Sequence, residues 1–142
     1  PYEYTRVDNH NISFAIDSPK GLVVPNVKNC QDKSIFEIND DFNRILSDAK
    51  NGVLGPKDLM EGTFSISNIG NIGGTYLGPI ILPPQVCIVA LGKSQLLPRY
   101  IKKDNGELEV APRSIMNVSY GCDHRVLDGA TIARFSNVWK SL

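Results

Sequence analysis

The residue types best suited to chemistry lie in the segment Asp123–Gly129, which reads DHRVLDG. His124 stands where a predicted strand passes into the last predicted helix, and a side chain at such a junction can be exposed in a cleft. Histidine ordinarily titrates near neutral pH, so His124 could act as a general base. A hydrogen-bonded structural histidine is the commoner alternative, and the residues alone leave both open. Asp128 is the expected N-cap of the helix, whether or not it takes part in catalysis.

The second candidate is the glycine-rich stretch after Ser67, which reads NIGNIGG from Asn68 to Gly74. Such a loop could cradle a phosphate, but no Lys-Ser or Lys-Thr pair follows it and no periodic helix begins directly after it. The nucleotide-binding and dinucleotide-binding hypotheses are therefore weak. The spacing favours a turn that needs glycine for its backbone conformation. His10, between two asparagines ahead of a strand, is expected to be a surface or turn residue and not the base.

The composition limits the class of protein. The chain has 142 residues, enough for one domain with a core, and its 15 basic residues balance its 15 acidic residues. This balance argues against nucleic acid or an anionic membrane as the main partner. Three widely spaced cysteines, without a Cys-x-x-Cys pair, favour neither a disulfide framework nor a zinc site, and we expect a reducing compartment. No apolar run approaches a membrane-spanning length, and no signal-peptide pattern opens the sequence.

Hydrophobic spacing predicts the elements that hold these residues. The clearest helix runs from Ser34 to Lys50, with a capping box formed by Ser34 and Glu37 and with Gly52 just beyond its end. A last helix follows Asp128. Alternation of Ile12, Phe14 and Ile16 with polar residues predicts one half-buried strand. Further strands or apolar segments are expected at 22–24, 63–67, 80–82, 86–91 and 115–120, with a tight turn at 104–106. Together these helices and strands predict an α/β domain in which a mixed sheet is covered on one side by helices.

Several motifs in one order support a family resemblance. The segment Asp123–Gly129 resembles the active-site signature of the dihydrolipoamide acyltransferases of 2-oxo acid dehydrogenase complexes, which chloramphenicol acetyltransferase shares in looser form. The stretches GLVVPNV, GTFSISNIG and the diproline PPQ, which begin at Gly21, Gly62 and Pro83, resemble the family's other signatures. The segments SNIGNIGGT and RFSNVWK most strongly resemble those of the branched-chain member. The implied fold is the chloramphenicol acetyltransferase-like fold of coenzyme A-dependent acyltransferases.

The resemblance implies a reaction and its residues. An acyl group, of the branched 2-methylpropanoyl type, would move between the thiols of dihydrolipoamide and coenzyme A. His124 Nε2 would remove the thiol proton, and the Ser67 hydroxyl would stabilise the oxyanion. Asp128 matches the second active-site position and is expected to hold the His124 loop without exchanging protons. The family's coenzyme A contacts match Asn68, Asn71, Gly92, Ser94 and Asp17; no metal is implied, and the three cysteines are expected to be packing residues.

The resemblance also implies partners and missing parts. Pro1 takes the place of an initiator Met, and the family's catalytic domain extends beyond both ends, so residues 1–142 are expected to be a partial catalytic domain without the lipoyl and subunit-binding domains. The stretch 100–107 is longer than is usual in the family and is expected to be a surface hairpin. Homotrimers with active sites between subunits would build a cubic core that binds the decarboxylase and dihydrolipoamide dehydrogenase. The expected location is the mitochondrial matrix, or the cytoplasm of a bacterium.

Three alternatives remain. The first is an acetyl-transferring member of the same family. The second is a non-catalytic core protein of the complex, which the presence of His124, Ser67 and Asp128 disfavours. The third is a small free-standing acetyltransferase resembling chloramphenicol acetyltransferase, and the wording from Gly62 to Gly74 argues against it.

Overall fold

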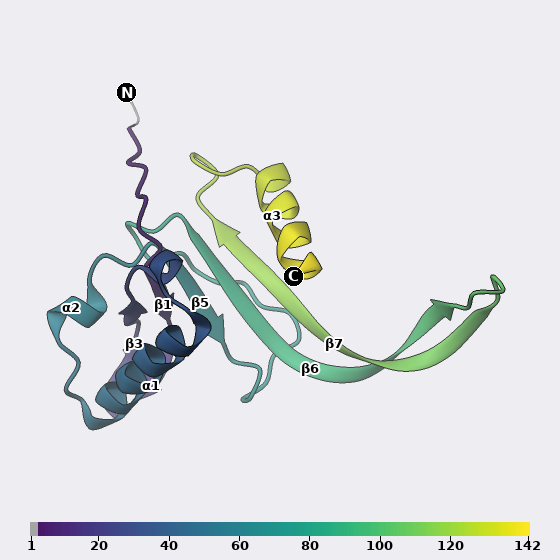
Figure 1. Cartoon of the computed structure of the whole chain (residues 1–142), viewed down its shortest axis with the longest axis horizontal. Helices are drawn as coiled ribbons and strands as arrows, with labels where there is room; N and C mark the ends of the chain where they lie inside the picture. Colours follow the sequence, from purple (N-terminus) through teal and green to yellow (C-terminus); the bar gives the residue numbers. More distant parts are fainter. Residues whose placement is uncertain (1–2) are drawn as a thin grey trace.

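The computed structural model describes residues 3–142, which fold around one mixed sheet (Figure 1). Five strands form this sheet in the order β4-β1-β5-β6-β7, and β2 and β3 form a separate hairpin. The elements are β1 (Ile12–Phe14), β2 (Ile16–Ser18), β3 (Gly21–Val23), β4 (Asn26–Val27), the 3₁₀ turn η1 (Cys30–Asp32), α1 (Ile35–Asn51), α2 (Pro56–Leu59), β5 (Phe64–Asn68), β6 (Cys87–Lys102), β7 (Leu108–Cys122) and α3 (Gly129–Ser141).

The sheet mixes two kinds of pairing. β5 runs parallel to both of its neighbours, β1 and β6, whereas β4 and β7 are antiparallel to the strands beside them. A parallel connection needs a long crossover, and the chain supplies it between β1 and β5 with the β2–β3 hairpin and helices α1 and α2.

Helix α1 is built as its sequence predicts. The Ser34 hydroxyl accepts a hydrogen bond from the Glu37 N–H, the Glu37 carboxylate accepts one from the Ser34 N–H, and Gly52 ends the helix in the left-handed conformation at φ 67°. Its buried residues Ile45 and Ala49 pack with residues of β2 and β4 in the main hydrophobic core.

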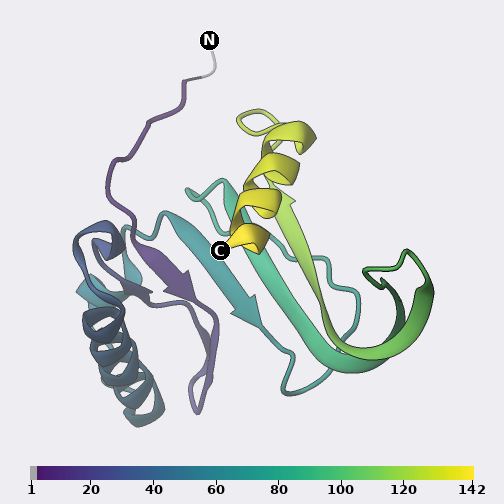
Figure 2. The same cartoon turned by 45° about the vertical axis from the view of Figure 1, so that its right-hand side comes forward.

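Both long helices cover the same face of the sheet, which we call the helix face. Phe14 of β1 meets Phe42 of α1 with ring centroids 4.9 Å apart, and Phe64 of β5 lies 6.1 Å from Phe135 of α3. Phe14 and Phe64 lie on one side of the sheet, because Ile12 is the register partner of Phe64 and side chains alternate along a strand. Figure 2 shows α3 lying across the strands. The predicted fold, a sheet with helices on one side, is confirmed.

The opposite face of the sheet holds a buried polar network, and the strand expected at residues 12–16 differs from the one observed. The chain bends after Phe14, so Ile16 belongs to β2 and not to β1. The polar position Ser13, expected to face solvent, is fully buried, because β1 is an interior strand. Gln85 donates to the Ser13 hydroxyl at 3.2 Å and accepts from the Ser65 hydroxyl at 2.7 Å, which gives these buried groups hydrogen-bond partners within the chain.

Strands β6 and β7 are much longer than the expected segments 86–91 and 115–120. They continue beyond the sheet as a curved two-stranded arm that turns at 104–106 (Figure 1). Cys87 to Ala90 are buried, as predicted for a central strand, while Leu96, Tyr100, Leu108 and Val110 on the arm are exposed. None of the helices described in residues 3–142 is long and apolar enough to span a bilayer.

Candidate active site

His124 is presented by a tightly bonded loop between β7 and α3. Its side chain is exposed, in a turn at 124–126. The backbone of Asp123 holds both ends of this turn: its N–H donates to the Val86 carbonyl at 2.9 Å, and its carbonyl accepts from Val126 and Leu127 at 3.0 and 2.9 Å. The loop is therefore fixed to the start of β6, and the exposed imidazole stands on an ordered support.

The side chains of Asp123 and Arg125 form a clamp under this loop. Arg125 Nε lies 3.0 and 3.1 Å from the two carboxylate oxygens of Asp123, Nη2 lies 2.6 Å from one of them, and the Arg125 N–H also donates to the carboxylate. Bonds from the guanidinium and the backbone favour the charged carboxylate and lower the pKa of Asp123 to about 2. Sequence reasoning missed this clamp, although an acid and an arginine on either side of His124 were a visible signal.

Asp128 caps helix α3, as predicted. Its carboxylate accepts a hydrogen bond of 2.6 Å from the Thr131 N–H in the first turn. This bond is the largest cause of the lowered pKa of Asp128, and the charge of His124 contributes in the same direction. Asp128 is therefore ionised at neutral pH and ties the end of the His124 loop to the helix.

Ser67 lies at the end of β5, on the face opposite the helices. It lines a cavity of about 380 Å³ whose walls are mostly aliphatic. The neighbouring hydroxyl of Ser65 on the same face is bonded to Gln85, as described above. The other residues lining this Ser67 cavity come from the β1–β3 region, the loop after β5 and β6: Ala15, Leu22, Val24, Ile69, Leu77–Ile80, Leu82, Ile88 and Ala90.

The glycine-rich loop after Ser67 is a tight turn packed against β6, which confirms the expected need for glycine. A Cβ on Gly70 would lie 2.7 Å from the Gly92 carbonyl oxygen, closer than atoms can approach, and Gly74 has φ 86°. The Asn68 side chain accepts from the Gly70 N–H at 3.0 Å, and the Lys93 N–H donates to the Gly74 carbonyl at 2.8 Å. The loop therefore follows the backbone of β6 closely.

This packing gathers some of the predicted coenzyme A contacts near Ser67. Asn68 is the register partner of Leu91, next to Gly92. Asn71 is exposed in the turn of the loop, and Ser94 lies beyond a register shift in β6, with its hydroxyl 2.8 Å from that of Ser114.

Asp17 belongs to a different element from the other predicted contacts. It is exposed on β2, opposite Leu22, and Leu22 lines the Ser67 cavity. Asp17 therefore stands near the rim of this cavity and not in its wall.

One chain does not bring His124 and Ser67 together. Ser67 pairs with Ala90 of β6, whereas Cys122, two residues before His124, pairs with Cys87. Three steps along β6, at about 3.3 Å each, separate these pairs by roughly 10 Å, and His124 lies still farther on. The two predicted catalytic groups thus stand at opposite ends of the central strands.

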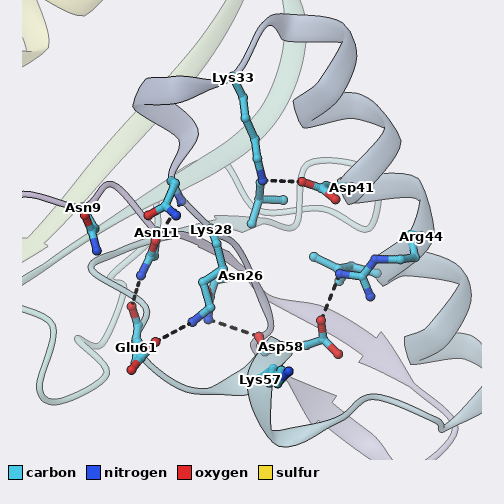
Figure 3. A pocket seen from close by; sticks show the side chains of 13 residues that line it. Asn9, Asn11, Asn26, Lys28, Lys33, Asp41, Arg44, Lys57, Asp58 and Glu61 are labelled. Atoms are coloured by element: carbon cyan, nitrogen blue, oxygen red, sulfur yellow. Dashed lines mark hydrogen bonds and ion pairs between the residues drawn. The ribbon is translucent and has the colours of Figure 1, made fainter.

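A cavity of about 520 Å³ between α1, β4 and α2 holds none of the predicted site residues (Figure 3). We call it the charged cavity. Lys33 meets Asp41 at 2.5 Å, Arg44 meets Asp58 at 3.0 Å, and Lys28 meets Glu61 at 3.4 Å. The first pair joins α1 to the segment before it, the second joins α1 to α2, and the third joins the residue after β4 to the segment after α2, which is a structural role. Within residues 3–142, no cluster of three or more His, Cys, Asp or Glu side chains could hold a metal ion.

Comparison with known proteins decides the family. The model of the 2-oxoacid dehydrogenases acyltransferase family, catalytic domain, matches residues 2–142. The chain belongs to this family. The match includes every predicted site residue, from Asp17 to Asp128, and it confirms the resemblance found in the sequence.

Named relatives and solved structures agree with this assignment. The chain is 58% identical, over 93% of its length, to the mitochondrial lipoamide acyltransferase component of the branched-chain alpha-keto acid dehydrogenase complex of Caenorhabditis elegans. Among solved structures, Azotobacter vinelandii dihydrolipoamide acetyltransferase superposes with TM-score 0.85 at 34% identity, covering 96% of this chain and 54% of that one. The cubic core of the pyruvate dehydrogenase multienzyme complex gives TM-score 0.82 at 33% identity, covering 93% and 52%.

The chain spans 29% of the length of the Caenorhabditis elegans relative. The Azotobacter structure addresses the role of a serine, a histidine and an asparagine in the catalytic mechanism of that enzyme, and its asparagine follows its histidine by four positions. Asp128 follows His124 by the same spacing. This chain therefore has a histidine and an acidic residue at the spacing that separates the histidine and the asparagine of the Azotobacter enzyme.

Proposed function

We propose that this chain is the catalytic part of an enzyme that moves an acyl group between dihydrolipoamide and coenzyme A. The observation that carries the proposal is the ordered loop that exposes His124, in a chain that belongs to the acyltransferase family over its whole described length. A histidine with a purely structural role would be expected to be buried, with its ring nitrogens hydrogen-bonded to other groups of the chain. His124 is instead exposed on a support formed by Asp123, Arg125 and Asp128.

The proposed reaction needs one base and one oxyanion donor. His124 Nε2 takes the proton from the coenzyme A thiol as the sulfur attacks the thioester carbonyl of acyl-dihydrolipoamide, since a thiol is mostly protonated at neutral pH. The oxygen of the tetrahedral intermediate accepts a hydrogen bond from the Ser67 hydroxyl. The intermediate collapses, the dihydrolipoamide sulfur leaves, and His124 returns the proton to it. No acyl-enzyme forms, so none of the cysteines is needed as a nucleophile.

The proposed acyl group is branched, of the 2-methylpropanoyl type, with acetyl as the alternative. The branched-chain assignment is supported by the much higher identity to the branched-chain relative than to the solved acetyl-transferring structure. The aliphatic walls of the Ser67 cavity are compatible with a branched hydrocarbon next to the reacting carbonyl.

For coenzyme A we propose contacts on the turn after Ser67 and on β6. Asn68 and Asn71 offer amide groups, Gly92 lies beside the turn, and Ser94 offers a hydroxyl. Asp17 near the rim of the cavity completes this set. We propose that residues 1–142 are a partial catalytic domain. The lipoyl group and the subunit-binding function would then be supplied by other domains of the protein.

We propose that the active site forms between two subunits, with His124 of one chain facing Ser67 of the next in a homotrimer. The separation of these two residues within one chain supports this proposal. The exposed apolar residues Leu96, Tyr100 and Val110 on the arm are suited to burial against another copy. By analogy with the cubic core, trimers would assemble further and bind the decarboxylase and dihydrolipoamide dehydrogenase. The proposed location is the mitochondrial matrix, which the mitochondrial relative supports.

Subunit complementation tests the shared site. Full-length His124→Ala and Ser67→Ala chains, each inactive alone, are unfolded together, reassembled, and assayed for acyl transfer to coenzyme A. At equal mixing, about one interface in four carries both intact residues, so a corresponding fraction of wild-type activity should return. The control is each variant reassembled with itself. Mixed assemblies that form but regain no activity would contradict the shared site.

The alternative of a non-catalytic core protein is distinguished by the same assay on the wild-type protein. A core protein would assemble but transfer no acyl group at any coenzyme A concentration. The presence of His124, Ser67 and the Asp128 cap in one chain favours the enzyme.

A further inference from the structure

Two of the three cysteines lie directly opposite each other in the β6–β7 ladder. Cys87 is the first residue of β6 and Cys122 is the last of β7, and they are register partners. Both side chains therefore point to the same face of the sheet. Cys87 is buried and Cys122 is half-buried. The third, Cys30, lies in η1 with its sulfur 3.5 Å from the Val27 carbonyl oxygen, beside the core that α1 covers.

A neighbouring hydrogen bond fixes the kind of pair that the two cysteines form. The Asp123 N–H donates to the Val86 carbonyl at 2.9 Å, so Val86 and Asp123 are a hydrogen-bonded pair of the antiparallel ladder. Such pairs alternate with non-hydrogen-bonded ones, in which the Cα atoms are about 4.5 Å apart and the side chains are closer. Cys87 and Cys122 occupy the next position and are a non-hydrogen-bonded pair. That spacing falls within the range of about 4.4–6.8 Å that a disulfide spans.

We infer that Cys87 and Cys122 are a redox-active dithiol, which low-molecular-weight disulfides convert to a cross-strand disulfide. The two thiols are already aligned by the ladder, so no backbone rearrangement is needed to join them. The site is independent of the proposed acyl transfer, although it lies two residues from His124. Oxidation would also remove the thiol hydrogen that Cys122 directs at the Leu127 carbonyl, 3.9 Å away in the His124 loop.

The oxidation proceeds in two exchange steps. The more accessible Cys122 thiolate attacks one sulfur of oxidised glutathione, forms a mixed disulfide and releases one glutathione thiolate. Cys87 then loses its proton to solvent, and its thiolate attacks the Cys122 sulfur and releases the second glutathione. Two protein thiols are oxidised and one glutathione disulfide is reduced to two thiols. Burial raises the pKa of Cys87 and slows it as a first nucleophile, but its fixed position beside Cys122 favours it in the second step.

Peptide mapping of the full-length protein tests this inference. The folded protein is treated with oxidised glutathione, quenched in acid, alkylated with iodoacetamide and digested with trypsin. The peptides 58–93 and 114–125 contain one cysteine each and should appear as one linked species, which dithiothreitol separates. Recovery of both peptides as alkylated forms, or as two separate glutathione adducts, after prolonged treatment would overturn the inference.

Matched variants show whether the ladder sets the specificity. The Cys30→Ser variant should give the same linked species as the wild type. The Cys87→Ser variant should stop at a stable glutathione adduct on Cys122. In protein unfolded in urea before treatment, the preference for the 87–122 link should disappear, and Cys30 should enter the products. A link that forms equally well in the unfolded chain would show that the pairing does not depend on the folded structure, and it would contradict the inference.

Discussion

The charged cavity and the Ser67 cavity use polar groups in opposite ways. In the charged cavity the basic side chains of Lys28, Lys33 and Arg44 each meet a carboxylate of the same chain, and these pairs connect α1, α2 and the segment between β4 and α1. The Ser67 cavity is mostly aliphatic and holds few polar side chains, and the base proposed to act with it lies at the other end of the strands.

This difference indicates which of the two cavities is the better candidate for a functional site. A charge that is neutralised by its own chain has its interactions satisfied, and removing it changes stability. A hydroxyl in an apolar cavity and an exposed imidazole can still be engaged by a substrate or by another subunit. The larger and more polar of these two cavities is therefore the structural one. Substitutions in the two regions should separate rate from stability.

The largest effect is expected for His124→Ala. Loss of a general base should reduce the turnover of acyl transfer by about 10²–10⁴-fold, because the thiol is mostly protonated without it. Steady-state assays of the full-length protein measure this loss, and circular dichroism checks the fold. His10→Ala is the matched control and should keep wild-type turnover. Turnover within a few-fold of wild type in His124→Ala would show that His124 is not the general base.

The next largest effect is expected for Ser67→Ala. Loss of one oxyanion donor should lower kcat by about 10²–10³-fold with little change in KM, since this hydrogen bond is strongest in the transition state. Ser65→Ala is the matched control on the same strand. It should instead lower the free energy of unfolding by about 1–3 kcal/mol, because Gln85 loses a buried donor, and it should leave kcat near wild type. A Ser67→Ala variant affected only in KM would give Ser67 a substrate-positioning role.

A smaller effect, on stability alone, is expected in the charged cavity. Asp58→Ala removes the partner of Arg44 and a hydrogen bond to the Gly55 N–H, and it should cost about 1–2 kcal/mol in urea unfolding. Turnover should stay within twofold of wild type. Asp40→Ala, on the exposed face of α1, is the control and should change neither quantity. A large loss of turnover in Asp58→Ala would show that the charged cavity also contributes to catalysis and is not only structural.

The smallest effect concerns acid stability of the His124 loop. The pKa of Asp123 is lowered from its ordinary 3.8 to about 2 in the folded chain, so its stabilisation is complete above about pH 5 and is lost as the pH falls through 3.8 toward 2. Thermal melting between pH 5 and 2 should therefore show a shallower acid decline in Asp123→Asn than in the wild type. Asp104→Asn, in the exposed hairpin turn, should decline like the wild type. Identical curves for Asp123→Asn and the wild type would show that the clamp contributes nothing to folding.

Local features of the molecule could be predicted from the sequence, and long-range ones could not. The capping box of α1 and the Asp128 cap follow from residues three positions apart, so spacing alone was enough. The burial of Ser13 depends on Gln85, 72 positions away, and no local pattern reports such a partner. The proposed site residues came from the family motif, whereas the placement of His124 and Ser67 at opposite ends of the strands required the register of three strands.

One irregularity in β6 shifts the alternation of side chains along the strand. Leu91 pairs with Val118 and Ser94 with Met116, so β6 advances three residues while β7 advances two. Before this offset the odd-numbered residues of β6 share the helix face; after it the even-numbered ones do, including Leu96 and Tyr100. Deleting the single residue Lys93 would restore plain alternation and leave Leu96 and Tyr100 on the helix face, because Ser94 would still pair with Met116. The bulge therefore accommodates one extra residue in β6 without changing the side of the ladder on which the arm displays its apolar residues.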